Sequence, residues 1–140
     1  MTASPWRFTL RITILFAIAV ATADPARACA CTGIGPACQE LWKASAVFVG
    51  KVEALTRAAN GDVTATFAVQ EWFRGTETRT VTVRTPSTAA GCGYVFRTER
   101  QYLVYASSVE GQSDLATTRC SRTQAFERAS SDLAYARNLS

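Results

Sequence analysis

The sequence predicts a mostly β protein: a closed or partly closed antiparallel barrel of five to six short strands, with a short helix before it and a helix after it. Three observations support this. Segments in which apolar and polar residues alternate recur along the chain, turn residues separate them at intervals of about 8 to 12 residues, and the two ends have helical patterns. A small β-sandwich fits the same periodicity, and composition does not decide between the two.

Residues 1–28 have the three parts of a secretory signal peptide. Two arginines supply positive charge, residues 12–20 form an apolar stretch, and residues 26–28 give the small-x-small pattern that signal peptidases cleave. The apolar segment at 10–23 is shorter than the roughly 20 residues that a transmembrane helix needs. We therefore expect cleavage after Ala28 and a secreted or periplasmic protein.

Cleavage would leave residues 29–140 as one domain that begins on Cys29. Losing residues 1–28 removes three arginines and one aspartate, which leaves 12 basic and 10 acidic residues. This charge is too small to favour nucleic acid or an anionic membrane as a partner, and we expect a monomer without membrane contact. A lipoprotein with an acylated Cys29 is an alternative, although Arg27 is unusual in such a signal.

The first half of the domain predicts a helix, a hairpin and their strands. Residues 36–45 suit a short helix because proline is favoured in a first turn. Residues 46–55 are rich in strand formers and contain Gly50, and a glycine inside a strand often marks a bulge or bend. Asn60-Gly61-Asp62 is typical of a hairpin turn, and the clean alternation over residues 63–70 predicts the returning strand.

The second half predicts three more strands and a helical tail. Residues 80–84 alternate again, residues 86–93 read as a loop, and residues 100–107 and 115–120 are two further strand candidates. From Ser121 onward, apolar residues recur at helical spacing. Ser121 and the glutamine three residues later have the pattern of a capping box.

The side chains argue against an enzyme. The chain has no histidine, which excludes Ser-His-Asp and Cys-His nucleophiles and the imidazole ligands of catalytic zinc. Its carboxylates are scattered singly rather than paired for acid–base work. The aromatic side chains are interpreted as core or rim packing, because a base-stacking surface would need a basic stripe beside them. These are Trp42, Trp72, Phe73, Tyr94, Tyr102 and Tyr105. We expect no catalytic residues and no cofactor of its own.

The cysteines are the remaining source of chemistry. All five lie after residue 28, where an exported protein favours disulfides over free thiols. Cys29 and Cys31 lie two apart on an extended segment and therefore point to opposite sides, so each reaches a different partner. The sequence leaves the pairing open. A redox or metal-carrying role for Cys29, Cys31 and Cys38 is an alternative.

Two bridges flanking one residue would hold the new N-terminus rigidly. A free α-amine titrates near pH 8, so part of it is unprotonated at neutral pH and is able to coordinate a metal. The carbonyl of the same residue closes a five-membered chelate ring. Cys29 would thereby be a bidentate ligand for a metal that belongs to another protein.

Several motifs resemble those of a known family. A domain that starts with Cys-x-Cys and continues with "AVFVGKV", "FAVQEWFRG", "AGCGY", "YLVYA" and "TTRCS" resembles the inhibitory N-terminal domain of the tissue inhibitors of metalloproteinases. More broadly it resembles the netrin-like domain, an OB-fold-like barrel. The likeness covers most of residues 29–122, and the Ala-rich leader with a single domain suggests a bacterial member.

The resemblance implies a set of site residues. The disulfides would be Cys29–Cys92 and Cys31–Cys120, with Cys38 as the free thiol. The amine and carbonyl of Cys29 would chelate the catalytic zinc of a partner, a zinc metalloprotease. The contact ridge on that protease would be formed by Cys29, Ala30, Cys31, Thr32, Gly33, Ala89, Ala90, Gly91 and Cys92.

The sequence departs from the family pattern at this ridge. Ala30 stands where inhibitory members usually have Ser or Thr, and Thr32-Gly33 stands where they have an apolar residue and proline. Both changes predict weak binding to the animal enzymes. The resemblance therefore implies a secreted metalloproteinase-inhibitor-like protein, with a non-inhibitory netrin-like or OB-type extracellular binding module as the alternative.

Overall fold

The computed structural model describes residues 29–88, 90–111 and 114–139. The expected signal peptide, residues 1–28, lies outside the described residues. The helices and strands follow the chain in the order α2 (Ala37–Lys43), β1 (Ala46–Arg57), β2 (Val63–Arg74), β3 (Thr80–Thr85), β4 (Gln101–Ser108), β5 (Leu115–Ala116), β6 (Gln124–Ala125), a 3₁₀ turn η1 (Phe126–Arg128) and α3 (Ser130–Arg137). In these ranges, no helix has the length and apolar character that crossing a membrane requires.

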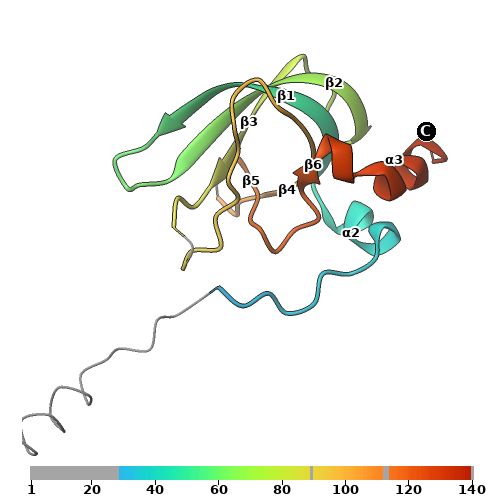
Figure 1. Cartoon of the computed structure of the whole chain (residues 1–140), viewed down its shortest axis with the longest axis horizontal. Coiled ribbons are helices and arrows are strands. Elements are labelled where there is room, and N and C mark those ends of the chain that lie inside the picture. Colours follow the sequence, from blue (N-terminus) through green and yellow to red (C-terminus); the bar gives the residue numbers. More distant parts are fainter. Residues whose placement is uncertain (1–28, 89, 112–113, 140) are drawn as a thin grey trace, which may run out of the picture.

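Five strands close into a mixed barrel, with β6 as an extra strand on β4 (Figure 1). β1 pairs with both β2 and β4, β2 pairs with β3, and the short β5 closes the ring between β3 and β4. The mostly β, OB-fold-like barrel between two helices is confirmed. The expectation of antiparallel pairing throughout is wrong for β3 and β5, which are parallel, because strand direction cannot alternate all the way round a closed ring of five strands.

β1 is bent and bulged, as the glycine at position 50 predicts. The register with β2 shifts beside Gly50 and again between Val52 and Ala54, where Glu53 is an extra residue on β1. A Cβ at position 50 would lie 3.1 Å from the Phe48 ring and 3.2 Å from the Ala68 carbonyl, so a side chain here would crowd both neighbours. Bulges of this kind increase the local twist that a small barrel requires.

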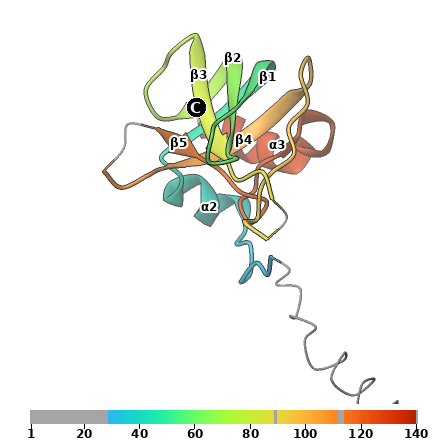
Figure 2. The same cartoon turned by 90° about the vertical axis from the view of Figure 1, so that its left-hand side faces the viewer.

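Two apolar clusters hold the molecule together. The first fills the barrel and is built around the fully buried Phe48 and Phe67. The second lies outside the barrel wall, where Val47 and Leu103 from β1 and β4 pack against Leu133 of α3 and its neighbours. Both α2 and α3 (Figure 2) contribute side chains to this second cluster, so they cover the outer face of β1 and β4.

The C-terminal tail differs from its expected form. The helical spacing after Ser121 produces α3 only from Ser130, preceded by β6 and the η1 turn. The expected capping box does not form, because the Ser121 hydroxyl donates to the Thr118 carbonyl at 2.9 Å and accepts from the Thr123 N–H at 3.1 Å. Those local hydrogen bonds keep this segment in a loop, so the helix begins at Ser130 rather than close to Ser121.

A buried ion pair ties the tail to the start of the domain. The Asp132 carboxylate, whose residue is 1% exposed, accepts two hydrogen bonds from Arg122 at 2.7 and 2.6 Å and one from the Tyr105 hydroxyl at 3.1 Å. Arg122 also donates to the Gly35 carbonyl at 2.9 Å. This cluster fixes the N-terminal segment against α3 and β4.

Candidate functional site: a basic groove beside the disulfides

The first described segment, residues 29–33, which we call the N-terminal tip, is held by two disulfides, Cys29–Cys92 and Cys31–Cys120, with Cα–Cα distances of 5.1 and 5.2 Å. They are the pairs that the family resemblance implied. The Sγ atoms of Cys29 and Cys120 lie 3.6 Å apart, so the two bridges touch. Cys38, on α2, is the free cysteine among the described residues, and it is exposed.

Within the described residues, three of these sulfur atoms lie close enough together to resemble the ligands of a metal site. The Sγ atoms of Cys29, Cys31 and Cys120 lie within 4.8 Å of one another. All three are bonded in disulfides, and a metal site needs thiolates rather than disulfide sulfur. The cluster is therefore a structural staple.

The expected contact ridge is partly assembled at this tip. Residues 30–33 are exposed, and the Cys29–Cys92 bridge brings them beside the exposed Ala90 and Gly91. Cys29 and Cys92 themselves are half-buried, and Ala89 lies outside the described residues.

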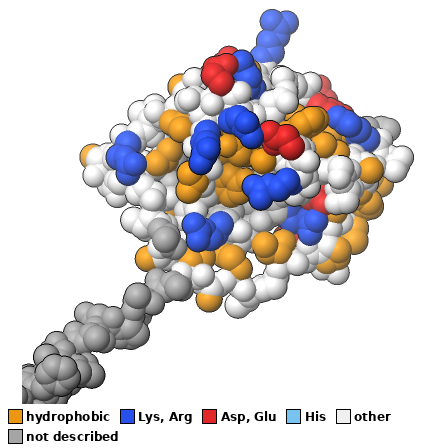
Figure 3. Space-filling view, viewed as in Figure 1, with side chains coloured by type: hydrophobic (Ala, Val, Ile, Leu, Met, Phe, Trp, Pro, Cys, Tyr) orange, Lys and Arg blue, Asp and Glu red, His pale blue; other side chains and the backbone are white. Residues whose placement is uncertain are grey.

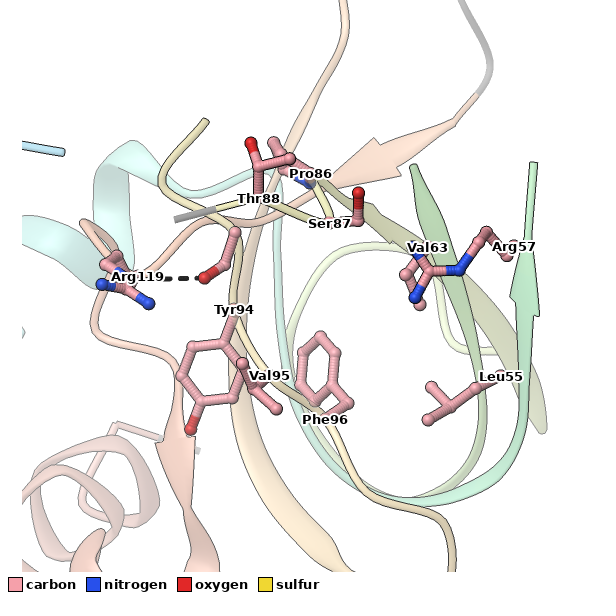
Figure 4. A pocket seen from close by; sticks show the side chains of 11 residues that line it. Leu55, Arg57, Val63, Pro86, Ser87, Thr88, Tyr94, Val95, Phe96 and Arg119 are labelled. Carbon is pink, nitrogen blue, oxygen red and sulfur yellow. Dashed lines mark hydrogen bonds between the residues drawn. The ribbon is translucent and has the colours of Figure 1, made fainter. Parts of the chain in front are cut away.

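A groove of about 490 Å³ opens immediately next to the bridges (Figure 4). Its volume lies within the range of about 300–1,000 Å³ that is common for small-ligand sites. The β1–β2 hairpin forms one side of the groove. Residues 86–88, after β3, form its end wall, and residues 93–96, before β4, form its floor. The lining residues are Leu55, Arg57, Val63, Pro86, Ser87, Thr88, Gly93, Tyr94, Val95, Phe96 and Arg119.

The floor segment is anchored at both ends by hydrogen bonds. At its start, the Gly93 N–H donates to the Thr88 carbonyl at 3.1 Å and the Tyr94 N–H donates to the Thr85 hydroxyl at 2.8 Å. At its end, the Arg97 N–H donates to the Tyr102 hydroxyl at 3.0 Å. Residues 95 and 96 are thus held in place without belonging to a strand.

Aromatic packing makes the floor rigid. The Phe96 ring lies 4.7 Å from the Tyr94 ring, 5.2 Å from Phe67 and 5.0 Å from Tyr102, measured between centroids. Burial raises the pKa of the Tyr94 hydroxyl, and the neighbouring Tyr102 adds to this effect, so Tyr94 is neutral at physiological pH. Val95 remains 73% exposed at the surface of this cluster.

Gly93 is required where the floor meets the end wall. A Cβ at this position would overlap the Pro86 carbonyl oxygen. Because Cys92 precedes it and is bridged to Cys29, the disulfide and the glycine together set how closely the two segments approach. The groove is therefore shaped by the same bridges that hold the N-terminal tip.

Two cations face this groove and no carboxylate does. Arg57 and Arg119 are its charged lining residues, and Figure 4 shows them on opposite sides of the aromatic floor. The backbone N–H of Arg119 donates to the Cys92 carbonyl at 2.8 Å, and its side chain makes a long contact of 3.4 Å with the Gly93 carbonyl.

The nearest hairpin carboxylate is already engaged elsewhere. Asp62 lies 3.9 Å from the Arg84 guanidinium and accepts from the Asn60 amide at 3.1 Å. Within the described ranges, the side chain of Arg57 has no ion pair or hydrogen bond. Figure 3 shows hydrophobic side chains gathered on one face of the molecule, with Lys, Arg, Asp and Glu side chains among and around them.

Sequence reasoning missed most of this groove. Tyr94 was among the aromatic residues that were interpreted as packing. Arg57 and Arg119 belong to no sequence motif, so nothing indicated that they line a binding site. The usable signal was the apolar run Tyr94-Val95-Phe96, which lies outside every predicted strand. Tyr102 and Tyr105 are buried, as core packing predicts, whereas Trp42 is 60% exposed and has the Arg74 guanidinium 5.4 Å from its ring centroid.

The family comparison decides the relationship of this chain to other proteins. The model of CAP, the cysteine-rich secretory protein family, matches residues 17–109. The chain belongs to this family. Cysteine-rich secretory proteins are typically secreted and are generally not conventional enzymes. A search of curated proteins found no match.

Membership of the cysteine-rich secretory protein family corrects the earlier assignment. The resemblance to tissue inhibitors of metalloproteinases and netrin-like domains was wrong as a family assignment. Inhibition of a zinc metalloprotease through the amine and carbonyl of Cys29, and the netrin-like binding module offered as its alternative, are withdrawn with it.

The resemblance led to the wrong family because the quoted motifs encode the barrel wall and the disulfides. "AVFVGKV" is the first half of β1 and "YLVYA" is most of β4, and both are largely buried in the barrel wall. The cysteine motifs encode the bridges. Residues of this kind are required by any barrel of this shape, so they specify the fold and not the family or its function.

Proposed function

We propose that this protein is an exported, non-catalytic member of its family that holds an anionic, partly apolar ligand in the groove beside β1. One observation carries the proposal: two guanidinium groups and no carboxylate line a preformed groove with an aromatic floor. A hydrogen bond to a charged group contributes about 1.5–3 kcal/mol, and apolar surface contributes roughly 25 cal/mol for each Å² removed from water.

The rigidity of the groove supports binding. Its floor is fixed by hydrogen bonds at residues 93, 94 and 97 and by ring contacts, and its end wall is fixed through the Cys29–Cys92 bridge. A site that is ordered before the ligand arrives loses less conformational entropy on binding.

Export is supported by the disulfides together with the family. Stable disulfides form in oxidising compartments and are rare in the cytosol. Two bridges of sequence separation 63 and 89 in so short a domain fit a protein that works in the periplasm or outside the cell.

The test compares a charged ligand with its neutral counterpart. Isothermal titration would measure binding of 2-naphthoate and of 2-naphthamide, which differ in the carboxylate but share the aromatic body. We expect 2-naphthoate to bind at least tenfold more tightly, which corresponds to about 1.4 kcal/mol. Because the two guanidinium groups lie on opposite sides of the floor, the single carboxylate pairs with one of them, so either Arg57→Gln or Arg119→Gln should remove most of that difference and the other variant should remove little.

The matched control is Arg79→Gln. Arg79 is an exposed arginine directly before β3 and lines a separate hollow with Glu77 and Trp72, so this variant should bind like the wild type. Equal binding of the two naphthalenes, or an equal loss in all three arginine variants, would contradict the proposed function.

A further inference from the structure

We propose that the anionic ligand is an extended acidic peptide that adds as a strand to the free edge of β1 beside the groove. This inference rests on the proposed function, and it adds the class of ligand and the way in which the backbone is recognised. Adding a strand to an open sheet edge is a physically simple way of binding a peptide, because main-chain hydrogen bonds supply affinity and alternate side chains supply specificity.

The free edge arises because β4 is shorter than β1. β4 pairs with β1 only from Ala46 to Lys51. The last contacts are a hydrogen bond from the Val52 N–H to the Arg100 carbonyl and one from the Glu99 N–H to the Val52 carbonyl. Glu99 then adopts a positive φ of 62°, and the segment before it turns away to form the groove floor.

Residues 54–57 of β1 are consequently paired on one side only. Their partners are all on β2, from Thr66 to Val63, and all four residues are exposed. The space that a further strand would occupy is the groove itself, between this edge and residues 93–96.

The ladder shows which backbone groups the edge offers. The Ala58 N–H donates to the Asp62 carbonyl at 2.8 Å, and hydrogen-bonded pairs recur at every second residue of an antiparallel ladder. Thr56 is therefore directed to β2. Leu55 and Arg57 turn their N–H and carbonyl groups toward the open edge, where an added chain would meet them.

The bulge sets the side chains of this edge. If Glu53 were an ordinary paired residue of the ladder, alternation from the inward-facing Val52 would turn Leu55 and Arg57 away from the barrel, because each step along a strand changes the face. With the bulge, both line the groove. A peptide strand would place apolar side chains over Leu55 and Phe96 and a carboxylate beside Arg57.

Charge favours an acidic peptide over a second copy of this chain. A second β1 edge would bring another Arg57 to a site that already holds two guanidinium groups. An aspartate or glutamate on a peptide would instead supply the missing opposite charge.

The experiment uses synthetic heptapeptides as probes. Thr-Leu-Thr-Leu-Thr-Asp-Thr and its reversed sequence, each capped at both ends, allow for both strand directions. Fluorescence anisotropy with the purified protein should show saturable binding of at least one of them. The Asp→Asn peptide should bind at least tenfold more weakly, as should the acidic peptide to Arg57→Gln, whereas Arg79→Gln should bind like the wild type.

Backbone recognition is tested by N-methylation at two adjacent positions. In an added strand, neighbouring N–H groups point to opposite edges, so methylation of the third or the fourth residue should abolish binding while the other retains it. Equal effects at both positions, or no peptide binding in a protein that still discriminates 2-naphthoate from 2-naphthamide, would overturn the peptide inference and leave the proposed function intact.

A third outcome separates the second copy from the peptide. Sedimentation velocity should show a monomer at the concentrations used for the titration. A dimer that Arg57→Gln strengthens and the heptapeptide does not dissociate would overturn the peptide inference, because the edge would then be occupied by another copy of β1.

Discussion

At the scale of single residues, Asp132 is expected to contribute strongly to stability, because it is 1% exposed and paired with Arg122. Its carboxylate is buried and neutralises Arg122, whose side chain is 24% exposed. Asp132→Asn removes the negative charge and leaves the Arg122 guanidinium without its counter-ion. We expect the free energy of unfolding to fall by about 3 kcal/mol, the lower end of the range for a broken buried ion pair, because Arg122 is partly exposed. Urea denaturation would measure it.

The matched control is the exposed pair between Glu71 and Arg137. Its bonds are also short, at 2.7 and 3.0 Å, but the side chains are 35% and 51% exposed. Glu71→Gln should cost less than about 1 kcal/mol. An equal loss in the two variants would show that burial does not set the strength of the Arg122–Asp132 pair.

Acid should weaken the protein through the same residue. Burial alone would raise the pKa of Asp132, but Arg122, with the Tyr105 and Ser131 hydroxyls, outweighs it and lowers this pKa. Because the folded pKa lies below the unfolded value of about 3.9, the stabilisation is complete above that pH and is lost as the pH falls through the lower folded value. Unfolding free energies should therefore drop below about pH 4, and Asp132→Asn should show a smaller drop.

At the scale of elements, loss of the Cys29–Cys92 disulfide should lower both the free energy of unfolding and the affinity of the groove for its ligand. The double variant Cys29→Ser/Cys92→Ser frees a loop of sequence separation 63, for which the chain-entropy view gives a loss of about 4 kcal/mol at most. Because Cys92 precedes the groove floor, binding of 2-naphthoate should fall as well. Calorimetric unfolding and titration would measure both, and Cys38→Ser, at an exposed free thiol, should change neither.

The free edge of β1 gives a second prediction at this scale. The Leu55 N–H points to the open edge, so Leu55→Pro removes a donor for an added strand without breaking the β2 ladder, and proline is tolerated at such edges. Leu55→Ala removes a similar apolar side chain but keeps the N–H. Heptapeptide binding should be lost in Leu55→Pro and only weakened in Leu55→Ala; equal binding by both would count against strand addition.

How well the elements could be predicted depended on how local their causes are. The hairpin at Asn60-Gly61-Asp62 and its alternating strands were predicted because turn chemistry and burial act within a few residues. The extra residue Glu53 was not, since a bulge depends on the facing strand. The start of α3 was misplaced because Ser121 bonds to the Thr118 carbonyl rather than to the helix.

The whole molecule shows why the site was harder to predict than the barrel. Arg57 and Arg119 are far apart in the sequence and line one groove because β1 extends beyond the end of β4 and because Cys120 is bridged to Cys31. The cysteine motifs were visible, and they led to the wrong family because they encode a staple that different proteins can share. The match to the cysteine-rich secretory protein family over residues 17–109 corrected that assignment.

Chemical-shift mapping shows directly whether the groove beside β1 is where this protein binds its ligand. On titration of the ¹⁵N-labelled protein with 2-naphthoate, we expect the largest amide shifts at Leu55, Arg57, Val95 and Arg119. Shifts centred instead on the exposed tip at residues 30–33, or on the hollow around Trp72 and Arg79, would contradict the proposed site.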